Sequence, residues 1–171
     1  MARFGPANAK GEVADRVRER RAGALTPLDD VLLHSEPLAE GWNALLGAVR
    51  TGFELPADLR ELVVLRVAAI NGADYEWVAH APLARAAGLG EAHLAALLDG
   101  GDTSVLTDLQ RACLDYTDAM TRDIAVPQST FERVREHLGT RQTVELTATV
   151  GAYNLVSRFL VAMQIEPTSG G

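Results

Sequence analysis

The 171-residue sequence contains a single cysteine, Cys113, and this scarcity limits its chemistry. One thiol can neither close an intrachain disulfide nor supply a cysteine cluster for zinc. Lysine is equally scarce, because Lys10 is the only one and arginine supplies nearly all the positive charge. The formal net charge of −7 disfavours a nucleic-acid-binding surface. We therefore expect no nucleic-acid partner, no thiolate-bound metal and an inert, buried thiol.

Long apolar runs are also missing. No stretch reaches the length of a membrane span, since the longest apolar segments contain Arg or Glu. The N-terminus is polar and charged and has no apolar run of the signal-peptide type. These features predict a cytoplasmic protein without a membrane partner.

The sequence does contain one helical pattern after another, without convincing strand alternation. Hydrophobic residues make up 47% and charged residues 23%, as in ordinary globular domains. We predict an all-α fold of seven or eight helices in a single domain over residues 11–165. Residues 1–10 and 166–171, rich in Gly, Pro, Ser and Thr, are expected to be flexible tails.

Local signals place several helix boundaries. Proline favours the first helical turn and glycine favours the residue after the last one. Thr103 or Ser104 is expected to cap a helix over about 105–121. Gly139 is expected to end a short helix over about 130–138. The helix that follows, over about 141–164, is the most apolar and should lie in the core or at a subunit interface.

A predicted helix hairpin contains an unusual group of polar residues. Asn71-Gly72 permits a sharp change of direction between two successive helices. Glu76 and His80 are four residues apart and share one face of the second helix. Glu61 interrupts an apolar run on the first helix and can approach His80 across the hairpin. A carboxylate fixes the tautomer of a neighbouring histidine, so the three residues form a candidate proton-transfer site.

Plainer interpretations stand beside this one. Glu-x-x-x-His is often only a surface pair on a helix. A metal site is disfavoured, because the sequence has neither a repeated Glu-x-x-His nor a His-Glu-x-x-His. Core packing or helix capping would also explain the further candidates for substrate binding. These candidates are Tyr75, Trp77, Tyr153, Asn154 and His34.

Residues 59–88 resemble the core segment of the carboxymuconolactone decarboxylase family, which includes the alkylhydroperoxidase D (AhpD) proteins. The similarity lies in Leu-Arg-Glu-Leu-Val-Val-Leu, Asn-Gly-Ala-Asp-Tyr-Glu-Trp-Val-Ala-His and Ala-Arg-Ala-Ala-Gly. It extends more loosely from about Pro37 to Met163. The resemblance implies an all-α fold in which a helix hairpin lines the site. It also implies a homo-oligomer, commonly a trimer or hexamer.

One departure from the family pattern separates two chemistries. In the hydroperoxidase branch, a glutamate is followed by Cys-x-x-Cys and then by a histidine. Counting from Glu61, the cysteine positions fall on Ala73 and Glu76, and the histidine falls on His80. Peroxide reduction through a dithiol needs a thiolate nucleophile and a resolving thiol. The decarboxylase branch uses no cysteines, and the resemblance then implies His80 as proton donor and Glu61 as its relay.

We therefore expect an enzyme that performs cofactor-free acid-base chemistry on a small carbonyl or lactone compound. Decarboxylation, isomerisation, cyclisation and dehydration all remain open. A neutral substrate is favoured unless Glu76 is protonated, because no arginine is obviously placed to pair with a substrate carboxylate. Arg60 and Arg66 do not share the helix face of Glu61. The alternatives are a peroxidase-type antioxidant protein and a non-catalytic binding or scaffold protein.

Overall fold

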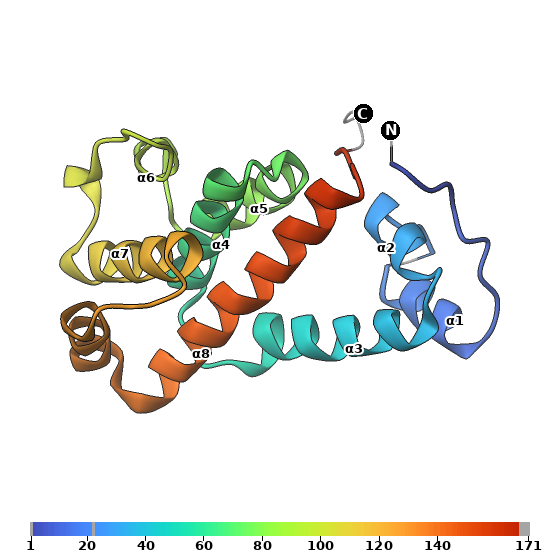
Figure 1. Cartoon of the computed structure of the whole chain (residues 1–171), viewed down its shortest axis with the longest axis horizontal. Helices are drawn as coiled ribbons and strands as arrows, with labels where there is room; N and C mark the ends of the chain where they lie inside the picture. The colour runs from blue at the N-terminus through green and yellow to red at the C-terminus, as the bar shows by residue number, and fades with distance from the viewer. Residues whose placement is uncertain (1, 22, 168–171) are drawn as a thin grey trace.

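The computed structural model describes residues 2–21 and 23–167, and the regular structure in these residues is entirely helical (Figure 1). The predicted all-α class is confirmed. A π-helical turn at Ala48–Gly52 follows α3, and a 3-10 turn at Thr103–Val105 precedes α7. The helices are α1 (Glu12–Arg20), α2 (Pro27–Leu32), α3 (Glu36–Gly47), α4 (Ala57–Asn71), α5 (Asp74–Ala86), α6 (Glu91–Ala96), α7 (Asp108–Arg122) and α8 (Gln128–Ala162). In this part of the chain, no helix is both long and apolar enough to span a membrane.

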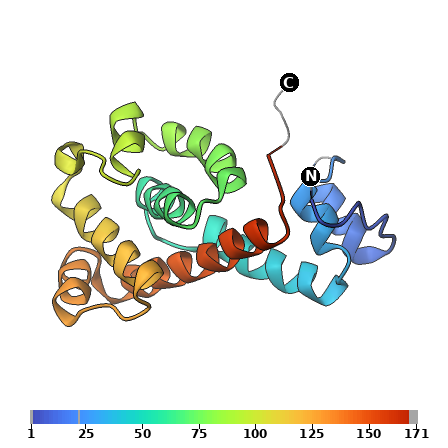
Figure 2. The same ribbon diagram turned by 45° about the horizontal axis from the view of Figure 1, so that its top comes forward.

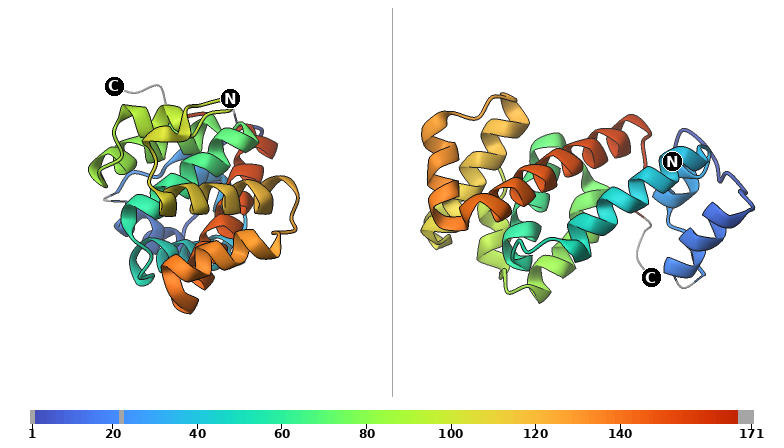
Figure 3. Two further views of the ribbon diagram at one scale, coloured as in Figure 1. Left: turned by 90° about the vertical axis from the view of Figure 1, so that its left-hand side faces the viewer. Right: turned by 90° about the horizontal axis from the view of Figure 1, so that it is seen from below.

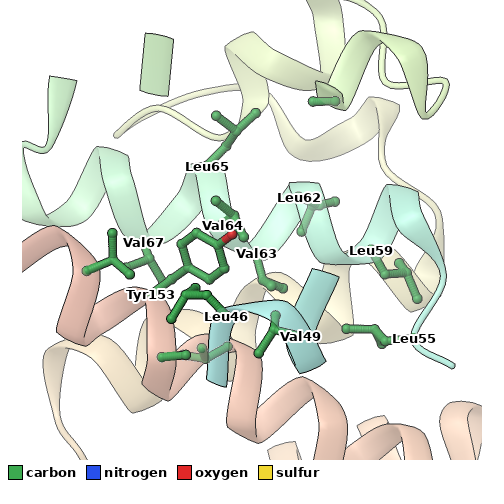
Figure 4. Packing of buried hydrophobic residues seen from close by; sticks show 14 of the residues in the cluster. Leu46, Val49, Leu55, Leu59, Leu62, Val63, Val64, Leu65, Val67 and Tyr153 are labelled. Carbon is green, nitrogen blue, oxygen red and sulfur yellow. The ribbon is translucent and has the colours of Figure 1, made fainter. Parts of the chain in front are cut away.

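Helix α4 lies at the centre of the core, where α5, α7 and α8 surround it (Figure 2). Every residue from Leu62 to Ala68 is buried, so the helix contacts neighbours on all sides. Figure 4 shows the leucine and valine side chains of α4 packed beside Leu46, Val49 and Tyr153. Leu46 lies on α3, Val49 in the turn after it and Tyr153 on α8. Each fully buried Leu or Val stabilises the fold by roughly 1.5–3 kcal/mol.

The predicted hairpin joins α4 to α5. Gly72 follows α4 with φ of 63°, a left-handed conformation that glycine adopts at little cost. The backbone N–H of Ala73 returns to the carbonyl of Ala68 at 2.9 Å and closes the helix end. Helix α5 begins at Asp74 and packs along α4, which brings the residues of both helices into one interface.

Helices α1 and α2 lie at one end of the molecule, where they pack on α3 (Figures 1 and 3). Residues expected in the N-terminal tail contact α1 and the residue that follows α8. The N–H of Arg3 donates to the carbonyl of Met163 at 3.0 Å, and Arg18 donates to the carbonyl of Ala9 at 2.6 Å. Residues 168–171 of the expected C-terminal tail lie outside the described residues.

The structure corrects one predicted boundary and bears out another. Helix α7 begins at Asp108 and is capped by Thr107, so the prediction of Thr103 or Ser104 as the cap is wrong. The Thr107 hydroxyl accepts from the Gln110 N–H at 3.2 Å, and the Gln110 side chain accepts from the Thr107 N–H at 3.0 Å. Gly139 does interrupt helical geometry within α8, with φ of 69° and ψ of −179°.

Candidate functional site

Glu61 of α4 and His80 of α5 meet across the hairpin. The His80 Nδ1 lies 2.7 Å from Glu61 Oε2, and the Glu61 residue is only 3% exposed. An Nδ1–H donated to this carboxylate leaves Nε2 as the ring atom available to a ligand. The other carboxylate oxygen of Glu61 accepts from Arg60 Nε at 3.0 Å. Arg60 thus does reach Glu61, contrary to the expectation from the helix faces.

The environment of Glu61 favours its charged form. Burial acts to raise the pKa of this carboxyl, but the hydrogen bond and charge of His80 oppose it, as do those of Arg60. The opposing effects prevail and hold the pKa of Glu61 below its usual range. Glu61 is therefore an ionised carboxylate that orients the His80 ring.

A cavity of about 300 Å³ lies beside this pair. Its volume suits a small molecule. Helices α5 and α8 and the α1–α2 end of the chain all contribute to its wall, and His80 lines it directly. The rings of His80 and Tyr153 meet edge to face, with centroids 5.1 Å apart and an interplanar angle of 89°. The lining residues are Arg21, Thr26, Leu28, Arg50, Tyr75, Glu76, Ala79, His80, Leu83, Tyr153, Val156 and Leu160.

Glu76 lines the same cavity and is only 1% exposed. Neither of its carboxyl oxygens has a hydrogen-bond partner among the described residues. Burial raises the pKa of Glu76 well above its usual range, and the charge of Arg50 opposes this only in part. Glu76 therefore favours the neutral acid, which can donate a hydrogen bond into the cavity.

The structure separates the candidate substrate-binding residues. Tyr75 and Tyr153 line the cavity with His80, whereas Trp77 does not. Trp77 instead faces a separate hollow on the far side of α5, with Ala73 and Leu98 in its wall.

Asn154 and His34 also lie away from the cavity lining. The Asn154 amide is buried in a polar network, where it donates to Thr121 Oγ1 at 3.0 Å and accepts from Asn71 at 3.1 Å. His34 is exposed, and its Nε2 lies 2.9 Å from the carbonyl oxygen of Gly5. Asn154 thus links α8 to α7 and α4, and His34 contacts the N-terminal segment before α1.

Two arginines of the site escaped the sequence-based prediction, which expected no arginine clamp. Arg50 comes from the π-helical turn, and its Nε lies 3.5 Å from the Tyr153 hydroxyl. Arg21 follows α1 and lines the cavity from the N-terminal side. Helical spacing identified neither of them, because Arg50 lies in a π-helical turn and Arg21 lies just beyond the end of α1.

No cysteine is among the described residues that line the cavity. Cys113 lies on α7, is fully buried and is absent from the cavity lining. Burial raises the pKa of its thiol to about 12, which suppresses the nucleophilic thiolate.

Within the described residues, no three His, Cys, Asp or Glu side chains are grouped to hold a metal ion.

The helix hairpin, with its buried histidine-carboxylate pair, defines the protein as AhpD-like in fold. Residues 36–119, just under half of the chain, match the sequence profile of the carboxymuconolactone decarboxylase family, and this segment belongs to that family. The family resemblance seen in the sequence is thereby confirmed. A sequence comparison with curated proteins finds no match.

Solved structures extend the similarity over most of the chain. A protein of unknown function from Agrobacterium tumefaciens, suggested to be the antioxidant defence protein AhpD, is 26% identical with a TM-score of 0.74. The match covers 80% of this chain and 94% of that one. A peroxidase-related protein with an AhpD core from Ralstonia eutropha JMP134 is 22% identical, with a TM-score of 0.81. That match covers 99% of this chain and 93% of the other. A cysteine-to-alanine variant of the debrominase Bmp8, in complex with 2,3,4-tribromopyrrole, is 15% identical, with a TM-score of 0.75. That match covers 99% of this chain and 95% of the other. The last two similarities concern the fold alone.

Proposed function

We propose that the protein is an enzyme that performs cofactor-free acid-base chemistry on a small carbonyl or lactone compound. The observation behind this proposal is the buried His80–Glu61 hydrogen bond at the wall of a cavity that also contains the unpartnered acid Glu76. Decarboxylation, isomerisation, cyclisation and dehydration each need a proton moved at such a site.

In this proposal His80 is the general acid-base group. Its Nε2 removes a proton from, or delivers one to, a carbon next to the substrate carbonyl, while ionised Glu61 stabilises the ring in its charged form. Glu76, as a neutral acid, donates a hydrogen bond to the oxygen where negative charge develops. Tyr75 and Tyr153 shape the wall around the reacting atoms.

Peroxidase activity is the first alternative, favoured by the descriptions of two structural relatives. Its usual dithiol has no counterpart here, because Ala73 and Glu76 occupy the cysteine positions and Cys113 is remote from the cavity. If this alternative holds, replacing Cys113 with Ser abolishes hydroperoxide consumption.

A non-catalytic binding or scaffold protein is the second alternative. It predicts a filled pocket and tolerance to replacement of Glu61 and His80. The open cavity and the buried, unpartnered carboxyl of Glu76 both count against it, since such a carboxyl costs stability that a mere scaffold would not need.

The decisive experiment compares His80→Ala with His137→Ala, a matched change of an exposed histidine on α8. Proton NMR in D₂O would follow a panel of β,γ-unsaturated γ-lactones and β-keto acids for isomerisation, deuterium uptake and loss of carbon dioxide. We expect His80→Ala to lower turnover by about 100-fold or more and to fold normally. Full activity in folded His80→Ala, or wild-type rates equal to buffer, would contradict the proposal.

A further inference from the structure

The cavity is lined by an arginine, Arg50, that lacks an ion-pair partner within the described part of the chain. Arg50 is partly buried, and among the described residues it forms no ion pair with a carboxylate within 4.0 Å. Its Nε lies near the oxygen of Tyr153, so the hydroxyl proton of Tyr153 remains available to a ligand. A partly buried guanidinium without a counter-ion gains a favourable partner when an anionic ligand binds beside it.

The surrounding charges reinforce this positive character. Arg20 and Arg21 both contact buried Asp29, at 3.1 Å and 2.9 Å. Burial and the charges of Arg21 and Arg50 lower the pKa of Arg20, with Asp29 opposing. The charges that act on Arg20 therefore come from two guanidinium groups and one carboxylate. Glu76 does not restore the balance, because its buried carboxyl favours the neutral form.

We propose that Arg50, with the Tyr153 hydroxyl beside it and Arg21 from the α1–α2 end, binds a carboxylate of the substrate and selects it over uncharged analogues. Arginine suits this role because its planar donors match a carboxylate in a two-bond geometry. The unpartnered carboxyl of Glu76 lines the same cavity, and in its neutral form it adds a donor. The inference rests on the proposed function, since it assumes that the cavity is the substrate site.

The arrangement also orients the substrate. Tyr153 contacts Arg50 through its hydroxyl and His80 through its ring, so it lies between the anion subsite and the proton-transfer pair. A carboxylate held at Arg50 places the rest of a small molecule against His80. Arg21 lies outside the family segment 36–119, so this part of the subsite belongs to the chain's own N-terminal helices.

The test is a binding measurement on the full chain with two probes that differ in charge. These are 5-oxotetrahydrofuran-2-carboxylate and its uncharged carboxamide, titrated by calorimetry or protein NMR. We expect the wild type to bind the carboxylate at least about tenfold more tightly than the carboxamide. Arg50→Gln should remove this preference and Arg50→Lys should retain part of it. Arg133→Gln, an exposed arginine paired with Asp115, is the matched control and should behave as wild type.

The outcomes separate this inference from the proposed function. Equal affinity for the two probes, unchanged carboxylate affinity in folded Arg50→Gln, or no carboxylate binding to the wild type at about 10 mM would overturn the subsite. His80→Ala should keep the preference for the carboxylate, because binding requires no turnover. A preference for the carboxylate probe without any turnover would contradict the proposed function and leave the subsite intact. Turnover that depends on His80 but not on Arg50 would contradict the subsite and leave the proposed function intact.

Discussion

Glu76 shows how one residue can oppose stability and serve the site. Its carboxyl is buried without a hydrogen-bond partner, and a carboxyl in that position costs free energy of folding. It also occupies one of the positions where the redox branch of the family has a cysteine. Residues that oppose stability in this way are concentrated at functional sites, which supports a role for Glu76 in the site.

The first prediction concerns Glu76→Gln and pH. The pKa of Glu76 is raised on folding, so the folded protein binds more protons than the unfolded chain above the ordinary value of 4.5. Wild-type stability should therefore fall relative to the variant as pH rises from about 5 to 8, with a slope of at most about 1.4 kcal/mol per pH unit for the one proton. Urea denaturation at several pH values measures the difference.

The matched control is Glu136→Gln, which changes an exposed glutamate of α8. It should follow the pH dependence of the wild type. A Glu76→Gln curve parallel to that of the wild type from pH 5 to 8 would show that Glu76 is ionised in the folded protein. The role of Glu76 as a neutral donor would then be wrong.

At the same scale, the sequence predicted the His80–Glu61 contact but could not separate similar residues. Glu61-Leu62 and Glu145-Leu146 look alike, yet Glu145 is structural. Its carboxylate accepts the N–H groups of Glu54 and Leu55 at 2.7 Å and 2.9 Å. Only the tertiary contacts distinguish a carboxylate that holds a loop from one that orients a histidine.

Among the secondary-structure elements, the helix boundaries marked by a proline or a glycine could be predicted well from the sequence. Gly72 and Gly139 break helices as expected, because both adopt positive φ. The start of α7 was misplaced because three hydroxyl residues precede it, and only Thr107 has a glutamine three residues later. The π-helical turn at Ala48–Gly52 has no clear sequence signal, so the position of Arg50 was missed.

The second prediction follows from this cap. Thr107→Ala removes the side-chain acceptor for the Gln110 N–H and should lower the free energy of unfolding by about 1 kcal/mol. Ser104→Ala changes an exposed hydroxyl that caps nothing and should cost less than about 0.5 kcal/mol. Chemical denaturation of both variants decides the matter, and equal losses would refute the assignment of the cap.

At the scale of the whole molecule, the site depends on parts of the chain that are far apart. The hairpin supplies His80 and Glu61, α8 supplies Tyr153, and the turn after α3 supplies Arg50. The sequence pattern could predict the hairpin, because its two helices are adjacent along the chain. It could not predict that α1 and α2 close the same cavity, because that contact depends on how α3 spans the molecule.

The third prediction concerns assembly. We propose a homo-oligomer, a trimer or hexamer, because large apolar side chains remain exposed on the single chain. Val78 and Leu83 on α5 are 54% and 51% exposed, and Val144 and Leu155 on α8 are 63% and 48% exposed. Light scattering should give about three or six times the chain mass of 18.3 kDa. An apolar interface should also persist in about 1 M salt, which screens ion pairs but not apolar burial. A mass of 18.3 kDa at all protein concentrations would contradict the proposal, and the four side chains would then need another partner.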